Sequence, residues 1–107
     1  GVNASTGQGG LQRLDLRHNE LGDEGATVLA EALCGGDSAI LHLDLSANSI
    51  GLKGALALAK TLKANKTLMV LDLRGNAIAR KGVEALQDAC GESGVTDRQL
   101  LLPVTAQ

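Results

Sequence analysis

The stretch LQRLDLRHNEL (residues 11–21) decides the fold, because its apolar spacing returns twice further along the chain. Leu or Ile fills its first, fourth, sixth and eleventh positions and Asn fills the ninth, as also in ILHLDLSANSI (40–50) and LMVLDLRGNAI (68–78). Leu14 and Leu43 are 29 residues apart, and Leu43 and Leu71 are 28 apart. A period of this length is typical of a solenoid, in which each unit buries its apolar face against its neighbours.

The second half of each unit predicts a helix, because small apolar residues recur there at a helical spacing of three and four residues. The stripe consists of Ala26, Leu29, Ala30 and Leu33, then of Ala55, Leu58, Ala59 and Leu62, and finally of Val83, Leu86 and Cys90. Gln87 stands where the earlier units have Ala30 and Ala59, which indicates a change of packing in the last unit. We expect the chain to turn from strand into helix at Gly25, Gly54 and Gly82, which precede the stripes.

The charges at the helix starts differ between the units. Asp23 and Glu24 place negative charge at the positive end of the first helix dipole, which is favourable. Lys53, and later Arg80 and Lys81, stand at the same end of the other two helices. Packing must therefore hold those two helices.

The composition limits the functions that this chain can have. Its 107 residues allow one domain, and without Phe, Tyr or Trp the core must be built from Leu, Ile, Val and Ala. A formal net charge of -2 argues against a nucleic-acid surface, which is normally basic. No apolar run approaches the roughly 20 residues that a membrane helix needs, so we expect no membrane partner.

The LxxLDL runs, the recurring Asn19, Asn48 and Asn76, and the segment GDEGATVLAEAL (22–33) resemble leucine-rich repeats of the ribonuclease-inhibitor type. Repeats of this kind are shared with the sensor regions of NOD-like receptors and with the GTPase-activating protein for Ran. The resemblance implies an α/β fold, a right-handed solenoid that forms a horseshoe segment. A parallel β-sheet would line its concave face and α-helices its convex face.

The repeats divide the chain into three parts. Residues 1–10 (GVNASTGQGG) are expected to be a flexible linker or N-terminal extension, and residues 11–90 to form repeats over 11–39, 40–67 and 68–90. Residues 91–107 form a C-terminal terminating segment, with an edge strand at 100–104 because Pro103 lacks a ladder donor. No amphipathic helix precedes the first repeat, so we expect further repeats or another subunit, and hence a larger protein, to cover the N-terminal end of the stack.

The alternation along each strand predicts which side chains face the partner. Because the leucines point inward, the residues between them point outward from the concave face. They form three columns across the strands: Arg13, His42 and Val70; Asp15, Asp44 and Asp72; and Arg17, Ser46 and Arg74. These nine residues are the candidate partner-binding site, and His18 and Glu20 lie at its rim.

The Asp column has two interpretations. Three carboxylates in register could bind a protein partner with a basic or mixed-charge surface, which would relieve their mutual repulsion. Alternatively, Arg17 and Arg74 already neutralise the carboxylates, and for the column alone we favour this second interpretation. The recurring Asn19, Asn48 and Asn76 are interpreted as structural, because an amide side chain can satisfy backbone groups where each strand ends.

No constellation in the sequence supports catalysis, a cofactor or a metal site. His18 and His42 lack the accompanying nucleophile, base and orienting group, so both are interpreted as surface residues. Cys34 and Cys90 are two units apart, beyond the reach of a disulfide, and free thiols favour a reducing, intracellular and cytoplasmic location. Asn65 matches a glycosylation sequon, but we expect it to end the preceding helix in a left-handed turn.

The sequence therefore predicts a non-catalytic scaffold for protein–protein interaction, as the C-terminal repeat part of a larger protein or assembly. Three alternatives remain open. The chain could be the sensor repeats of a NOD-like immune receptor, a GTPase-activating protein of the Ran-activator type, or a structural subunit of a large complex.

Overall fold

The computed structural model describes residues 3–7, 10–34 and 38–104. Its elements in chain order are β1 (Asn3–Gly7), β2 (Gly10–Asp15), α1 (Gly22–Leu33), β3 (His42–Asp44), α2 (Leu52–Ala64), β4 (Val70–Asp72), α3 (Arg80–Glu92) and β5 (Gln99–Leu101). From β2 onward, strand and helix alternate as the repeat pattern predicts.

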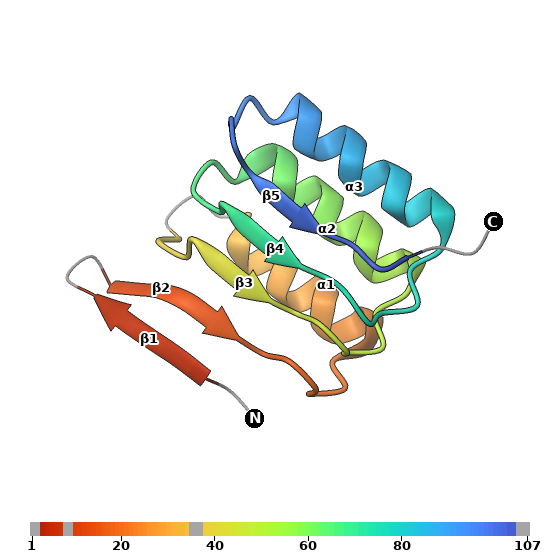
Figure 1. Ribbon diagram of the computed structural model, residues 1–107, viewed down its shortest axis with the longest axis horizontal. Helices are drawn as coiled ribbons and strands as arrows, with labels where there is room; N and C mark the ends of the chain where they lie inside the picture. The colour runs from red at the N-terminus through yellow and green to blue at the C-terminus, as the bar shows by residue number, and fades with distance from the viewer. Residues whose placement is uncertain (1–2, 8–9, 35–37, 105–107) are drawn as a thin grey trace.

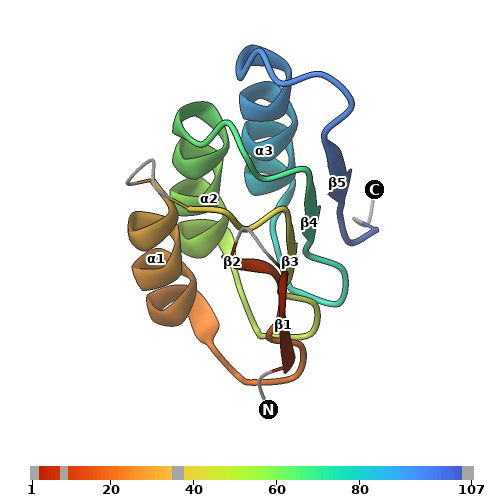
Figure 2. The ribbon, with the colours of Figure 1, turned by 90° about the vertical axis from the view of Figure 1, so that its left-hand side faces the viewer.

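The strands form one five-stranded sheet in the order β1-β2-β3-β4-β5. The strands β2 to β5 are parallel, and Leu14, Leu43, Leu71 and Leu100 are paired in register. The helices α1, α2 and α3 lie on the same side of the sheet (Figures 1 and 2), so no helix among the described residues covers the other side. The predicted α/β solenoid, with a parallel sheet on one face and helices on the other, is confirmed.

The hydrophobic core lies between the sheet and the helices. The inward leucines of the two central strands and the inward leucines of the helices are almost fully buried: Leu43, Leu45, Leu71, Leu73, Leu58, Leu62 and Leu86. The core is built from aliphatic side chains alone, as the composition requires. None of the helices that the structure describes is long and apolar enough to cross a membrane.

The first and last repeats are less covered than the middle one. Leu29 of α1 is only partly buried, whereas the equivalent Leu58 and Leu86 are buried behind a neighbouring helix. Val28 next to it is 67% exposed. At the other end Gln87 is exposed where Ala30 and Ala59 are buried, which confirms the expected change of packing in the last unit.

The N-terminal segment differs from the expected linker. Residues 3–7 form strand β1, which pairs antiparallel with β2 and shifts register between Ser5 and Thr6. The reason is that β2 would otherwise present an unpaired row of backbone donors and acceptors, which any chain segment can fill regardless of its side chains. The rest of the 1–10 expectation, residues 1–2 and 8–9, lies outside the described residues.

The C-terminal strand is shorter than expected. A strand does pair with β4 at the edge of the sheet, but it covers Gln99–Leu101 instead of 100–104. Pro103 lies beyond its end. Backbone pairing therefore stops at Leu101, before the residue that cannot donate a ladder hydrogen bond.

The recurring glycines serve close packing and do not mark the turn into the helix. Gly25, Gly54 and Gly82 lie inside the helices. A Cβ added to Gly54 would lie 3.0 Å from the Cβ of Ala26, and one added to Gly82 would lie equally close to the Cβ of Ala55. Glycine at positions 54 and 82 therefore lets adjacent helices approach each other, whereas an added Cβ at Gly25 would meet only Leu21.

Candidate protein-binding surface on the sheet

The side of the sheet that no helix covers presents the predicted columns in register. Arg13 pairs with His42 and then with Val70, and the three aspartates pair in the same way. Strand β5 adds Gln99 beside Val70 in the first column and Leu101 beside Asp72 in the second. The sequence analysis missed both residues, although the alternation around Leu100 implies them. We call these eleven residues the open sheet face: Arg13, Asp15, Arg17, His42, Asp44, Ser46, Val70, Asp72, Arg74, Gln99 and Leu101.

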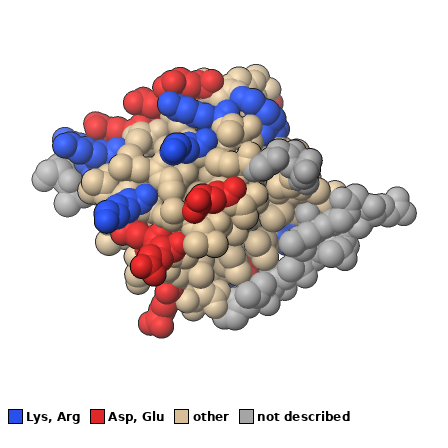
Figure 3. Space-filling model, turned by 180° about the vertical axis from the view of Figure 1, so that it is seen from behind, with Lys and Arg blue, Asp and Glu red and all other residues tan. Residues whose placement is uncertain are grey.

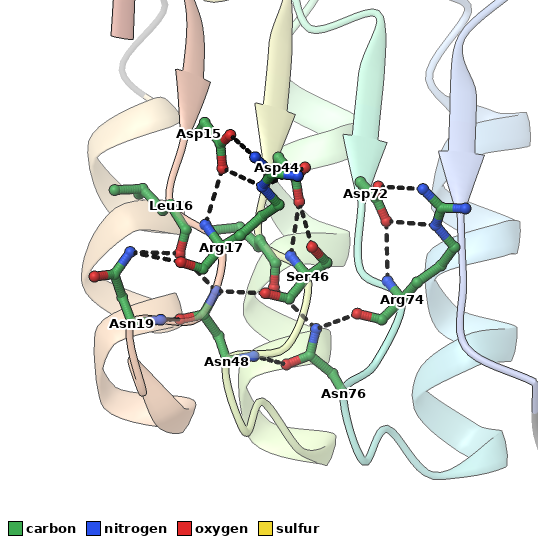
Figure 4. Close-up of polar contacts among 11 residues, drawn as sticks. Asp15, Leu16, Arg17, Asn19, Asp44, Ser46, Asn48, Asp72, Arg74 and Asn76 are labelled. Atoms are coloured by element: carbon green, nitrogen blue, oxygen red, sulfur yellow. Dashed lines mark hydrogen bonds and ion pairs between the residues drawn. The ribbon is translucent and has the colours of Figure 1, made fainter. Parts of the chain in front are cut away.

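Each aspartate of the open sheet face closes a tight local turn at the end of its strand. Its Oδ1 atom accepts a hydrogen bond from the backbone N–H two residues further on (Figure 4). The nitrogen-to-oxygen distance is 3.1 Å for Asp15, 2.9 Å for Asp44 and 3.1 Å for Asp72. The aspartates therefore fix the point at which each strand leaves the sheet.

Two of the aspartates also hold an arginine in a bidentate ion pair. The Nη2 atom of Arg17 lies 2.8 Å from Oδ2 of Asp15, and Nη2 of Arg74 lies 2.8 Å from Oδ2 of Asp72. In both pairs the arginine Nε donates to Oδ1. The third aspartate, Asp44, accepts from the hydroxyl of Ser46 at 2.7 Å. The expected neutralisation of the column by Arg17 and Arg74 is thus confirmed.

The pKa shifts agree with this arrangement. Burial acts to raise the pKa of Asp72, but the side-chain and backbone hydrogen bonds from Arg74 outweigh it and hold that pKa below its usual value. The backbone hydrogen bond from Arg17 is the largest cause of the lowered pKa of Asp15. The bond to Asp72 in turn raises the pKa of Arg74. Both pairs are therefore ionised at neutral pH.

The remaining residues of the face lack such partners. Arg13 is exposed, and its side chain forms no ion pair or hydrogen bond with any described residue. His42 and Val70 are half-buried, and His18 lies exposed at the rim with a φ of 56°. No group of His, Cys, Asp and Glu that could hold a metal ion occurs in the part of the chain that the structure describes.

Two of the recurring asparagines, Asn48 and Asn76, join neighbouring repeats, as the structural interpretation predicts. The Oδ1 atom of Asn48 accepts from the backbone N–H of Asn19 at 2.9 Å, and its Nδ2 donates to the carbonyl of Leu16 at 2.8 Å. Asn76 makes the equivalent bonds to Asn48 and Leu45. Because the Asn48 side chain is fully buried, it holds the repeats together and is not available to a partner.

Asp23 has a role that the sequence analysis missed. Its Oδ1 atom accepts from the backbone N–H groups of Gly51 and Gly54, both at 2.8 Å. A residue of α1 thereby caps the N-terminus of α2, which has no capping side chain of its own. The sequence gives no signal for it, because the cap comes from the neighbouring helix.

Arg98 was also missed. Its guanidinium donates to the carbonyl oxygens of Leu62 at 2.7 Å, Leu68 at 2.6 Å and Asn65. Burial lowers the pKa of this arginine. The side chain therefore ties the segment before β5 to the end of α2, where helix carbonyls lack partners.

Asn65 corrects one expectation. Its φ of -83° and ψ of 127° are extended, not left-handed, and its side chain is the reason. The Nδ2 atom donates to the carbonyl of Leu33 at 3.0 Å, and Oδ1 accepts from the backbone of Leu68 at 2.8 Å. The residue is 2% exposed, so in the folded chain this sequon asparagine is inaccessible.

Both cysteines are free thiols in the structure. Cys34 at the end of α1 lies with its Sγ atom 3.4 Å from Oγ1 of Thr61. Cys90 is partly buried and packs against the core, as expected of a small apolar residue in the helix stripe.

One of two comparisons with known proteins, the match to a family model, agrees with this architecture. A search of curated proteins finds no significant match. The family model described as leucine-rich repeat matches residues 11–30, 40–59 and 64–86, together more than half of the chain. Each match begins at or just before the predicted repeat start and ends within the helix that follows. The chain therefore belongs to the leucine-rich repeat family.

Proposed function

We propose that this chain is a non-catalytic scaffold that binds a protein partner on its open sheet face. Leucine-rich repeats commonly mediate protein–protein interaction, using the extended surface that stacked repeats create. The observation that carries the proposal is the exposure of Arg13, Arg17 and Arg74, which are spread over that face. The core leucines and the side chains of Asn48 and Asn76 are buried. These exposed charged groups are available for a partner.

Photocrosslinking in cell extract tests this proposal. Benzoylphenylalanine in place of Val70 is expected to form a covalent adduct with a defined protein. The same group in place of Lys60, an exposed residue on the helix side, is the matched control. Adducts of equal yield from both positions, or none from position 70, would contradict a binding site on the open sheet face.

A second interface is supported by the partly exposed flank of α1. Leu21 just before α1, and Gly25 and Leu29 within it, are half-buried, whereas their counterparts in the next two repeats are buried. We propose that a helix of an adjoining repeat or subunit covers this flank in a larger assembly. Because β1 already pairs with the edge of β2, the contact would be made by α1 and not by sheet extension. Sedimentation of Val28→Glu against the parent chain tests it, since the charge should abolish any such association.

A further inference from the structure

We propose that the partner of the open sheet face presents an acidic protein segment to it, with carboxylates that bind Arg13, Arg17 and Arg74. The inference rests on the proposed function and adds the chemistry of the partner. It reverses the basic or mixed-charge partner that the Asp column suggests in the sequence.

The aspartates of the face are withdrawn from solvent and already bonded. The side chain of Asp72 is 6% exposed, that of Asp44 is 16% exposed and that of Asp15 is 26% exposed. In every one of them Oδ1 accepts from a backbone N–H, and a side chain of the same strand end donates to it as well. A basic partner would therefore find few free acceptors here.

The arginines, by contrast, point donors outward. The side chains of Arg17 and Arg74 are 54% and 63% exposed, and Arg13 is exposed as well. Each bidentate pair uses the Nε and Nη2 edge of the guanidinium, and no described residue hydrogen-bonds to Nη1. Because the aspartates already fix Arg17 and Arg74 in place (Figure 4), a carboxylate that binds there orders fewer rotamers.

The spacing of the arginines fits several anionic groups and not one. Arg13 lies in β2 and Arg17 lies two residues beyond its end, so at most about 13 Å of backbone separates them at roughly 3.3 Å per residue. Arg74 follows β4, two strands from β2, which separates it from Arg17 by about 10 Å at roughly 4.8 Å per strand. Because Arg17 and Arg74 are each held by their own aspartate, a single phosphate or carboxylate is a poor match for all three arginines. A polypeptide segment that carries several Asp or Glu residues can do so.

The rest of the chain favours a protein segment over a nucleic acid. The formal net charge is -2 and the chain has no aromatic side chain on which a base could stack. On the helix side, Lys and Arg are intermingled with Asp and Glu (Figure 3), so no broad basic surface continues from the open sheet face. Val70 on β4 and Leu101 on β5, both half-buried, are the apolar residues of the face.

Fluorescence anisotropy with labelled twelve-residue peptides tests the proposal. The probes are a peptide of alternating Glu and Ala, its Lys and Gln counterparts, and a twelve-nucleotide oligothymidylate. We expect the Glu peptide to bind at least about tenfold more tightly than the other peptides at low salt. Tighter binding of the Lys peptide or the oligonucleotide, or no binding of the Glu peptide at millimolar concentration, would overturn the proposal.

Two variants of equal charge change separate the face from net charge. Arg13→Glu should weaken binding of the Glu peptide about fivefold or more, because the Arg13 side chain forms no ion pair or hydrogen bond with the residues that the structure describes. Lys60→Glu, on the helix side, should leave it nearly unchanged. Equal losses in both variants would show a nonspecific effect of charge and overturn the proposal.

Identifying the partner segment that crosslinks to position 70 tests this inference separately from the proposed function. Mass spectrometry of the adduct should find a segment with more Asp and Glu than Lys and Arg. An adduct with a basic or uncharged segment would overturn the acidic partner while supporting the scaffold function. The absence of any adduct would instead contradict the proposed function itself, even if the Glu peptide binds tightly.

Discussion

Oδ1 of Asn76 lies 2.9 Å from the backbone nitrogen of Asn48, so that the side chain of one repeat completes the backbone of the repeat before it. The same relation holds one unit earlier, between Asn48 and Asn19. Each of these two buried amides acts both as acceptor and as donor across the boundary between repeats, which is why the position does not vary within this chain.

Replacing Asn48 with Ala is therefore expected to destabilise the whole stack. The variant leaves the backbone N–H of Leu21 and the carbonyl of Leu16 without their partner, and we expect a loss of about 2–4 kcal/mol in the free energy of unfolding. Urea denaturation followed by circular dichroism measures it. The control Gln87→Ala removes an exposed amide and should change stability by less than about 0.5 kcal/mol. Equal losses of stability in the two variants would refute the structural role of Asn48.

Asp23 should matter more for α2 than for its own helix. Asp23→Ala removes the acceptor for Gly51 and Gly54, and the loss of such a cap typically costs about 1 kcal/mol. Glu24→Ala removes an exposed acidic residue from the same turn of α1 and is the matched control. Hydrogen exchange at Gly54 should speed up in the first variant alone. Unchanged exchange there would show that the cap is dispensable.

The repeat pattern was enough to predict the fold and the columns of the face because both follow from local alternation and a fixed period. Leu43 and Leu71 fall in register for that reason. Asp23 and Arg98 could not be predicted, since their partners are backbone groups of another unit, and such contacts leave no trace in residue spacing. Strand β1 was not predicted, because backbone pairing at a sheet edge needs no apolar pattern in the sequence.

Exposure on the face was the other quantity that the sequence could not supply. The columns name Asp72 and Arg74 as equally outward residues, yet the arginine is 63% exposed and the carboxylate beneath it 6%. The difference arises because a short side chain at the end of a strand bonds to the backbone, while a long one reaches over it. The charge exposed to a partner is therefore the positive charge of the arginines, and not the negative charge that the regular column of aspartates indicates.

Two glycines should respond in opposite ways to the same substitution. A Cβ at Gly54 would lie 2.7 Å from Cγ2 of Ile50 and 2.9 Å from Oδ1 of Asp23, so Gly54→Ala should destabilise the chain by about 1–3 kcal/mol. Gly91 in α3 has nothing within 4 Å of an added Cβ, and Gly91→Ala should stabilise by about 0.5–1 kcal/mol. Thermal unfolding compares the two. Stabilisation by both would mean that close helix approach is not required at Gly54.

The Asp72–Arg74 pair should make stability depend on pH in the acid range. The folded-state pKa of Asp72 is below the usual 3.8, so its contribution is present above that value and is lost as pH falls through the lower, folded pKa. Urea titrations from pH 6 to pH 2.5 should show this fall, and Asp72→Asn should flatten it. Arg74→Gln should also reduce the fall, because it removes side-chain interactions that hold the folded pKa of Asp72 below its unfolded value. An Asp72→Asn curve that keeps the parent's slope would refute the assignment.

Arg98 should determine whether the last strand stays attached to the repeats. Arg98→Ala leaves three carbonyl oxygens without their charged donor, and we expect a loss of about 2–4 kcal/mol, with faster hydrogen exchange in Gln99–Leu101. Arg98→Lys should recover only part of this, because an ammonium lacks the planar fork that reaches Leu62, Asn65 and Leu68 together. Arg80→Ala removes an exposed arginine from the start of α3 and serves as the control. Full rescue by lysine would show that charge alone, and not the fork geometry, holds the terminal strand.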